Sequence, residues 1–222
     1  MSVYNSHDIF NRFGNLSDCY FQEQSPKARY LYVPGERNDR VVLVAHADTF
    51  WDDAYLPKIN PAGIGADDRV GCAILWSLRN SGHSLLVTDG EEDGNQGAGL
   101  LANNNERLLS ELNDGHQFMV EFDLRGADGF KCYDIGTPVF RQYIGSVTGY
   151  SDWGRSSATD ICLLCRNICG VNISAGFHNE HCQAESIDGA EWLHTTAMAE
   201  AWLAQPLPKF SLDTEIVHIR NG

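Results

Sequence analysis

Apolar segments of strand length alternate with segments of helical period along most of this chain. The strand-like runs lie at 28–34, 40–47, 84–89, 118–124, 130–135 and 171–175. The spacing of apolar residues predicts helices over 67–80, 97–112, 137–147, 158–169 and 187–204. Because helices that alternate with strands pack on both faces of one sheet, we expect an α/β fold. Its three layers, α/β/α, would surround a mixed and mostly parallel sheet.

The last two predicted helices carry patterns that specify more than their position. The helix over 158–169 is expected to begin in a sequence similar to a capping box, Ser-Ala-Thr-Asp at 157–160. Its three cysteines are expected to be small buried side chains, since no second Cys or His pair completes a zinc finger. These are Cys162, Cys165 and Cys169. The apolar face expected for the helix over 187–204 comprises Ile187, Ala190, Leu193, Ala197 and Ala201.

Length and charge limit the function classes open to the chain. The 222 residues suit one α/β domain and no stretch resembles a linker, so we expect a single domain over 1–222 with its core at about 28–204. The formal charge of −14 repels phosphate and anionic lipid, which argues against nucleic-acid and membrane-surface partners. The first residues lack the basic start and apolar run of a signal peptide, and no run approaches the roughly 20 apolar residues of a membrane span. A cytoplasmic location is therefore expected.

Histidine and carboxylate side chains follow the strand-like runs. His46 and Asp48 come directly after VVLVA. Two residues apart on an extended backbone they lie on the same side, so Asp48 can hold the second ring nitrogen of His46. Glu121 and Asp123 face one side of their own strand, where a buried carboxylate needs a partner. A histidine-rich loop that contains His181 follows VNISA.

Acidic residues also gather at two further loops. The sequence TDGEEDG at 88–94 places four carboxylates in five residues, which repel one another unless cations bind between them. Asp67 follows a loop with two glycines at the start of a predicted helix, where the helix dipole favours a carboxylate. Each feature alone is also explained by a solvated turn or a helix cap. Together, at strand ends of one sheet, they suit a hydrolytic Zn²⁺ pair, with Mn²⁺ or Co²⁺ as alternatives.

Five sequence motifs occur in an order that resembles a known superfamily. AHADT, GADDRVGCAIL, TDGEEDGNQGA, EFDL and HCQAESID follow one another between 41 and 204. They resemble the motifs of the two-zinc aminopeptidase and carboxypeptidase superfamily, which includes peptidase T, the glutamyl aminopeptidases and the bacterial leucyl aminopeptidases. The segment ATDICLLCRNICGVNIS is similar to the superfamily's segment before its last metal ligand. The resemblance implies a dinuclear zinc metallohydrolase on the zinc-peptidase fold.

The resemblance also implies a role for each matching residue. His46 and Asp123 would bind the first metal, Glu92 and His181 the second, and Asp67 would bridge both.

Asp48 would orient His46, and Glu91 would be the general base. No lid domain fits into the 18 residues between Asp48 and Asp67 or the 57 between Asp123 and His181. Groups that a lid would supply must therefore come from elsewhere in the chain.

Three further residues are candidates for contacts with the substrate. They are Arg125, Tyr150 and His178. His178 is also an alternative to His181 as a metal ligand, although the spacing from His181 to Glu185 matches the superfamily better.

The expected substrate is a short peptide, with an N-acyl amino acid as the alternative. A free amine could be held by the carboxylates near the motifs, Asp89, Glu91, Asp93 and Glu121, which favours an aminopeptidase. A free carboxylate would need a cation instead, and the nearby cations are Arg69, Arg125, Lys131 and Arg155. A carboxypeptidase, an amide deacylase, a glutaminyl cyclase and a non-catalytic binding protein remain alternatives. The oligomeric state stays open.

Overall fold

The computed structural model describes residues 5–52 and 63–212 of the chain. An eight-stranded mixed sheet runs through the molecule in the order β1-β2-β4-β3-β5-β8-β6-β7. In that order the strands are Tyr20–Glu23, Arg29–Val33, Ser84–Thr88, Val42–His46, Met119–Leu124, Gly170–Ser174, Gly129–Lys131 and Ser151–Asp152. The expected α/β fold with a mixed sheet is confirmed.

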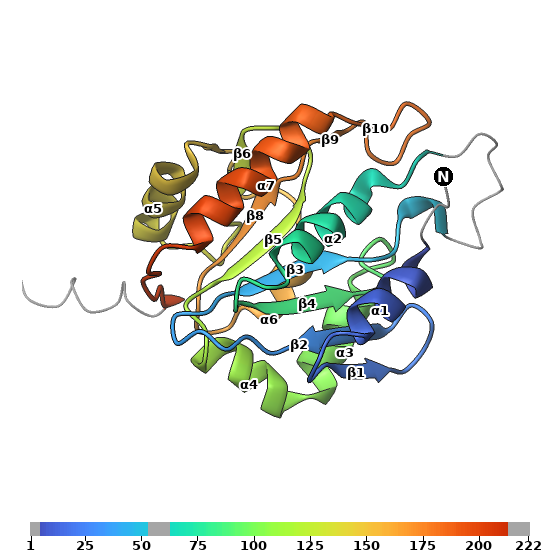
Figure 1. The fold of residues 1–222 in the computed structure, drawn as a ribbon, viewed down its shortest axis with the longest axis horizontal. Coiled ribbons are helices and arrows are strands. Elements are labelled where there is room, and N and C mark those ends of the chain that lie inside the picture. The colour runs from blue at the N-terminus through green and yellow to red at the C-terminus, as the bar shows by residue number, and fades with distance from the viewer. Residues whose placement is uncertain (1–4, 53–62, 213–222) are drawn as a thin grey trace, which may run out of the picture.

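Helices cover both faces of the sheet (Figure 1). One face packs against α1 (Ser6–Gly14), α2 (Ala66–Leu78), α5 (Pro138–Thr148) and α7 (Gly189–Leu203). The other face packs against α3 (Gln96–Asn104), α4 (Glu106–Asp114) and α6 (Asp160–Leu164). Side chains alternate along a strand, so in β3 Leu43 and Ala45 join the first core while Val42 and Val44 join the second.

The four central strands position the candidate site. β4, β3, β5 and β8 are parallel to one another, so their carboxyl ends lie along one edge of the sheet, to the right in Figure 1. Two short elements follow this edge, the 3-10 helix η1 (Phe50–Asp52) and the hairpin of β9 (Phe177–His178) with β10 (Ser186–Ile187). No helix within 5–52 and 63–212 is long and apolar enough to cross a membrane.

The expected helix over 97–112 is wrong in one respect, because the structure divides it. α3 ends at Asn104 and α4 begins at Glu106. Asn105 lies between them with a φ of −134°, and its side chain accepts a hydrogen bond from the amide of Leu108. This side-chain cap starts a new helix, which turns the chain at a position that the apolar spacing alone does not reveal.

The expected helix over 158–169 is shorter than predicted. α6 comprises only Asp160–Leu164, and its N-cap residue Thr159 makes no capping hydrogen bond with its side chain, so the expected capping box is wrong. Of the three cysteines, only Cys162 lies on the helix, while Cys165 is the C-cap residue and Cys169 directly precedes β8. Cys165 and Cys169 are buried and Cys162 is half-buried.

The buried face of the last helix is also opposite to the expected one. Leu193 is 60% exposed, and Ile187 lies in β10 before the helix begins. The helix instead buries residues that include Ala199, Trp202 and Leu203. These indole and leucine side chains carry more apolar area than the alanines of the predicted face, so burying them removes more of that area from water.

Candidate metal centre and active site

His46 ends β3 and lies fully buried at the carboxyl edge of the sheet. Its Nδ1 lies 3.2 Å from Oδ1 of Asp48. The same carboxylate accepts the backbone amides of Glu91 and Glu92, at 3.2 and 3.3 Å. Asp48 therefore joins the loop after β3 to the loop after β4. Because Nδ1 of His46 faces Asp48, the other ring nitrogen, Nε2, points away from Asp48.

Asp67 reaches the same edge from the start of α2. Gly65 has a φ of 64°, and the peptide bond between Asp67 and Asp68 is cis. Glu185 accepts the backbone amides of Gly65, Ala66 and Asp67 at 2.7, 2.9 and 3.2 Å. A carboxylate from the loop after β9 therefore holds the turn that carries Asp67.

Two groups of potential ligand atoms meet at Asp67. His46, Asp67 and Asp123 form one group, and Asp67, Glu92 and His181 form the other. Nε2 of His46 lies 3.2 Å from Oδ1 of Asp67 and 3.4 Å from Oδ1 of Asp123. Nε2 of His181 lies 3.2 Å from Oδ2 of Asp67 and 2.9 Å from Oε2 of Glu92. The two oxygens of Asp67 therefore face different groups.

Aromatic packing and a backbone amide hold the second group in place. The ring of Phe50 stacks on His181 with the ring centroids 4.8 Å apart. The backbone amide of Phe50 also donates to Oε1 of Glu92 at 3.1 Å. Residues from η1, from the loop after β4 and from the loop after β9 are thus brought to one point.

The donor set fits divalent cations. Nε2 of His46 and Oδ1 of Asp67 are buried and have no hydrogen-bond partner in the described part of the chain, although they lie 3.2 Å apart. Buried polar atoms normally have a partner, so these two atoms are available to a ligand. Imidazole nitrogen and carboxylate oxygen without thiolate suit a hydrolytic Zn²⁺ pair.

The titration behaviour of the cluster reflects an excess of buried negative charge. Burial and the neighbouring carboxylate of Asp67 raise the pKa of Asp123 to about 7. Burial, with the charges of Asp123 and Asp160, raises the pKa of Glu91 to about 9. Contacts with Asp67 and Glu92 raise the pKa of His181 to about 10. Bound cations would offset this repulsion and return the carboxyl groups to their ionised form.

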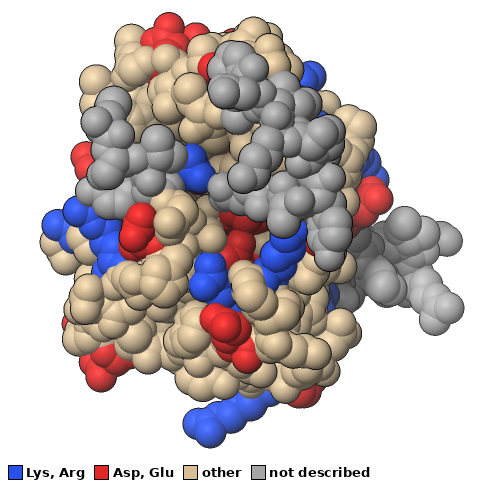
Figure 2. Space-filling view, turned by 90° about the vertical axis from the view of Figure 1, so that its right-hand side faces the viewer, with Lys and Arg blue, Asp and Glu red and all other residues tan. Residues whose placement is uncertain are grey.

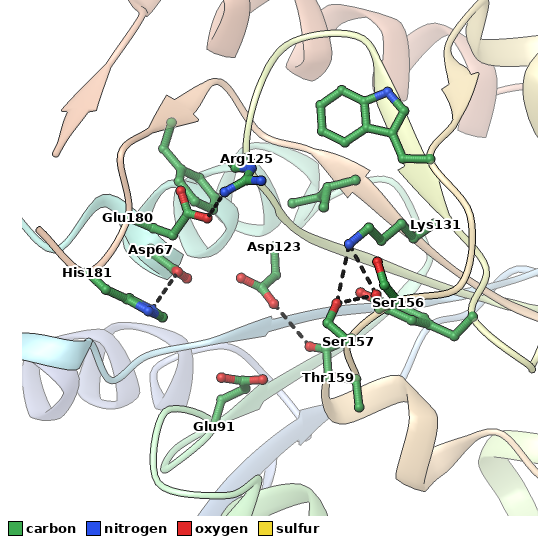
Figure 3. Close-up of a pocket in the computed structure, with 15 residues that line it drawn as sticks. Asp67, Glu91, Asp123, Arg125, Lys131, Ser156, Ser157, Thr159, Glu180 and His181 are labelled. Atoms are coloured by element: carbon green, nitrogen blue, oxygen red, sulfur yellow. Dashed lines mark hydrogen bonds and ion pairs between the residues drawn. The ribbon is translucent and has the colours of Figure 1, made fainter.

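Glu91 borders one pocket of about 460 Å³ together with Asp67, Asp123 and His181, which are members of the two ligand groups (Figure 3). Oε2 of Glu91 lies 4.0 Å from Nε2 of His46, and Asn95 donates to Oε1 of Glu91 at 3.2 Å. Figure 2 views this edge of the sheet and shows acidic side chains in a central hollow, with lysine and arginine side chains around it. Glu91 is thus a carboxylate that contacts the pocket without belonging to either ligand group.

Several supporting residues were not identified from the sequence. Thr159 donates to Oδ2 of Asp123 at 3.0 Å. Asp160 is fully buried and accepts from Thr88 and, at 3.0 Å, from the Asn95 amide that also binds Glu91. Thr159 and Asp160, at the start of α6, end the sequence Ser-Ala-Thr-Asp that predicts a helix start, and their place in the segment similar to the superfamily's was the signal for a role at the site.

The structure places the three candidate substrate contacts differently. Arg125 lines the pocket, where it pairs with Glu180 at 2.8 Å. Tyr150 does not line it, because its ring is buried and its hydroxyl lies 2.7 Å from that of Thr195.

His178 does not line the pocket either. Its Nε2 lies 2.5 Å from a carboxylate oxygen of Glu191. Between the two histidines of this loop, the geometry therefore places His181, and not His178, beside the carboxylates of Asp67 and Glu92.

Solved structures with a similar fold include peptidases and a glutaminyl cyclase. No family model and no curated protein sequence matches the chain. Aminopeptidase PepT from Bacillus cereus is 13% identical with a TM-score of 0.59, and the match covers 88% of this chain and 91% of that one. A glutaminyl cyclase from an Acidobacteriales bacterium is 14% identical with a TM-score of 0.64, covering 89% and 82%.

A third match is the peptidase TET1 of Pyrococcus horikoshii, which can assemble into a tetrahedron or a large octahedral shell. It is 12% identical with a TM-score of 0.60, and the match covers 90% of this chain and 93% of that one. At these identities the likeness concerns the fold. The chain therefore has the fold shared by these peptidases and glutaminyl cyclase, as the order of its sequence motifs predicted.

Proposed function

We propose that this chain is a dinuclear metal-dependent hydrolase of peptide or related amide bonds. The observation that carries the proposal is the carboxylate of Asp67, whose two oxygens face two separate groups of ligand atoms. His46, Asp67 and Asp123 would hold one Zn²⁺, and Asp67, Glu92 and His181 would hold the other. Mn²⁺ or Co²⁺ would suit the same donors.

When bound, the ions would activate water and polarise the carbonyl of the scissile bond. Glu91 would then act as the general base, since its carboxylate reaches the pocket and belongs to neither ligand group. Its Oε2 would accept the proton of the attacking water and transfer it to the leaving nitrogen. Asn95 would keep Oε1 oriented during both steps through the hydrogen bond of 3.2 Å.

Two forms of this function differ in the end of the substrate that is recognised. The aminopeptidases among the structures with this fold support an exopeptidase that acts on a free amine. Four carboxylates, those of Asp89, Glu91, Asp93 and Glu121, were expected to hold the free amine of an aminopeptidase substrate. They give this form weaker support, because Glu91 alone of the four lines the pocket. Asp89 pairs with Arg29 at 2.6 Å and Asp93 with Lys27 at 3.2 Å.

Glu121, the fourth of these carboxylates, is fully buried and does not line the pocket. The pocket does contain the cations Arg125 and Lys131. They favour a carboxypeptidase or a deacylase of N-acyl amino acids as the second candidate function, because a free carboxylate needs a cation.

Metal analysis of the purified protein tests the proposal. We expect about two divalent ions per chain and hydrolysis of at least one aminoacyl anilide, dipeptide or N-acyl amino acid. Asp67→Asn should lose at least one of the ions and the activity, because it removes the shared charge. The exposed residue Asp18 provides the matched control Asp18→Asn, which should keep both. Full occupancy in Asp67→Asn would refute the bridging role.

A further inference from the structure

Lys131 is a cation at the wall of the proposed active site, and no carboxylate in the described part of the chain pairs with it. It ends β6 and lines the pocket together with Asp67, Glu91 and Asp123. Its ammonium donates to the backbone oxygen of Ser156 at 3.1 Å and to the hydroxyl of Ser157 at 3.3 Å (Figure 3). Within 5–52 and 63–212 the structure shows no ion pair for it, so its charge remains available to an anion.

Arg125, on the same pocket, differs from Lys131 in this respect. Its guanidinium pairs with Glu180 at 2.8 Å, and its side chain is 64% exposed. The carboxylate of Glu180 neutralises Arg125, whereas the hydrogen bonds of Lys131 with the described residues go to neutral oxygens. A half-buried ammonium beside neutral acceptors gains more from an incoming carboxylate than an exposed guanidinium that already has one.

An aromatic wall stands next to Lys131. Trp153 lines the same pocket, and its ring lies against the backbone of Gly126 and Gly129. A Cβ atom at these two glycines would lie 2.8 and 2.2 Å from the ring, so any larger residue there would displace it. The amide of Trp153 also donates to the backbone oxygen of Phe130 at 2.9 Å. The wall is thus held in place, and it suits the hydrocarbon part of a substrate group that ends in a charge.

We propose that Lys131 binds a carboxylate of the substrate, so that the enzyme acts on acidic peptides or acidic amides. This inference rests on the proposed hydrolase function, since the same pocket holds the scissile bond near Asp67 and Glu91. The carboxylate can be the side chain of an Asp or Glu residue in the substrate, or a free main-chain terminus. Both present the same charge to Lys131, and the substrates chosen below separate them.

Pairs of substrates that differ in one charge test the proposal by kinetics. Glutamyl anilide against glutaminyl anilide tests a side-chain carboxylate, and a dipeptide with a free against an amidated C-terminus tests a main-chain one. The wild type should prefer the charged member of one pair. In Lys131→Met that preference, measured as a ratio of kcat/KM values, should fall roughly 10- to 100-fold, which is the usual contribution of one charge-assisted hydrogen bond.

Two further variants separate recognition from a structural role. Lys131 also links β6 to Ser156 and Ser157, and loss of that link alone would lower kcat/KM equally for charged and neutral substrates. Lys131→Arg should restore most of the preference. Arg155→Met removes a nearby cation that pairs with Asp134 at 3.0 Å outside the pocket, and it should leave the preference unchanged. An equal loss on both members of each pair in Lys131→Met would overturn the proposal.

Calorimetry keeps this inference distinct from the proposed function. Glutarate should bind to the zinc-loaded wild type at least tenfold more tightly than its uncharged diamide, and Lys131→Met should remove most of that difference. If glutarate binds in this way but no substrate is hydrolysed, the hydrolase proposal fails and the carboxylate site stands. If Lys131→Met binds glutarate as tightly as the wild type does, the carboxylate site is refuted, whatever the activity.

Discussion

The two ends of strand β4 both lie beside buried histidines, yet the pKa values of these histidines are shifted in opposite directions. At the amino end, near Ser84, burial lowers the pKa of His83, and it lowers the pKa of His116 to about 4. At the carboxyl end, near Thr88, burial by itself would lower the pKa of His46, but the carboxylates of Asp123, Asp48 and Asp67 raise it well above its usual range.

The hydrogen bonds of the two ends explain the difference. Nε2 of His116 accepts from the hydroxyl of Ser84 at 2.8 Å, and its Nδ1 donates to the backbone oxygen of Leu112 at 3.1 Å. His83 likewise uses both nitrogens, with the amide of Val41 and the oxygen of Leu203. Nε2 of His46 has no hydrogen-bond partner in the described part of the chain. Burial alone therefore does not mark a site, whereas an unpartnered nitrogen among surplus carboxylates does.

The variant Glu91→Gln, at the carboxyl end of the sheet, is expected to have the largest effect on activity. The variant removes the proposed base but none of the ligand atoms, so kcat should fall on the order of 10²–10⁴-fold while both metals remain bound. Steady-state kinetics with metal analysis of the same sample measures both. Glu36 is exposed and does not line the pocket, so Glu36→Gln is the matched control. Turnover near that of the wild type would place the base elsewhere.

A smaller effect is expected from Glu185→Gln, which changes a positioning residue. Glu185 accepts the amides of the turn before Asp67 and the indole N–H of Trp51 at 2.9 Å. A glutamine would turn one acceptor into a donor, so the turn should relax and Asp67 should lose its orientation.

Metal affinity in Glu185→Gln should fall roughly 10- to 100-fold, as is usual for residues that orient ligands. Titration with a competing chelator measures it. A role limited to overall stability would instead lower the melting temperature and leave the affinity for zinc unchanged.

The smallest expected effect concerns the amino end of the sheet and the pH. An unfolded histidine has a pKa near about 6.5, whereas the pKa of His116 is about 4 in the folded protein. Its neutral form therefore stabilises the fold above about pH 6.5, and that contribution is lost as the pH falls towards 4.

Urea unfolding of the wild type and His116→Gln at pH 7 and pH 4.5 measures this contribution. Between pH 7 and pH 4.5 the free energy of unfolding should fall in both proteins. The fall should be about 2 kcal/mol smaller in the variant than in the wild type. The exposed His7 provides the control His7→Gln, which should follow the wild type. If His116→Gln loses as much stability as the wild type does, His116 is protonated inside the fold, and the contrast between the two ends fails.

Local sequence determined the central strands and the order of the site residues. Strands are short and mostly buried here, so apolar runs identify them, and polar residues directly after each run must emerge at an edge of the sheet. His46 and Asp123 are therefore predicted to lie at one edge, and the resemblance of the motifs adds Asp67 from a helix start; the structure brings the three together in one group. The residue types and their places after the runs, or at the start of a helix, were sufficient for this prediction.

Only the tertiary structure decided which neighbours each side chain meets. The periodicity of the last helix does not show that Trp202 is buried while Leu193 is exposed, because the choice depends on the layer that the helix covers. The pairing of Arg125 with Glu180 and the hydrogen bonds of Lys131 to Ser156 and Ser157 likewise join residues that are far apart in the chain. A charge is neutralised by whatever the folded chain brings within a few ångströms of it, and distance along the sequence does not reveal that.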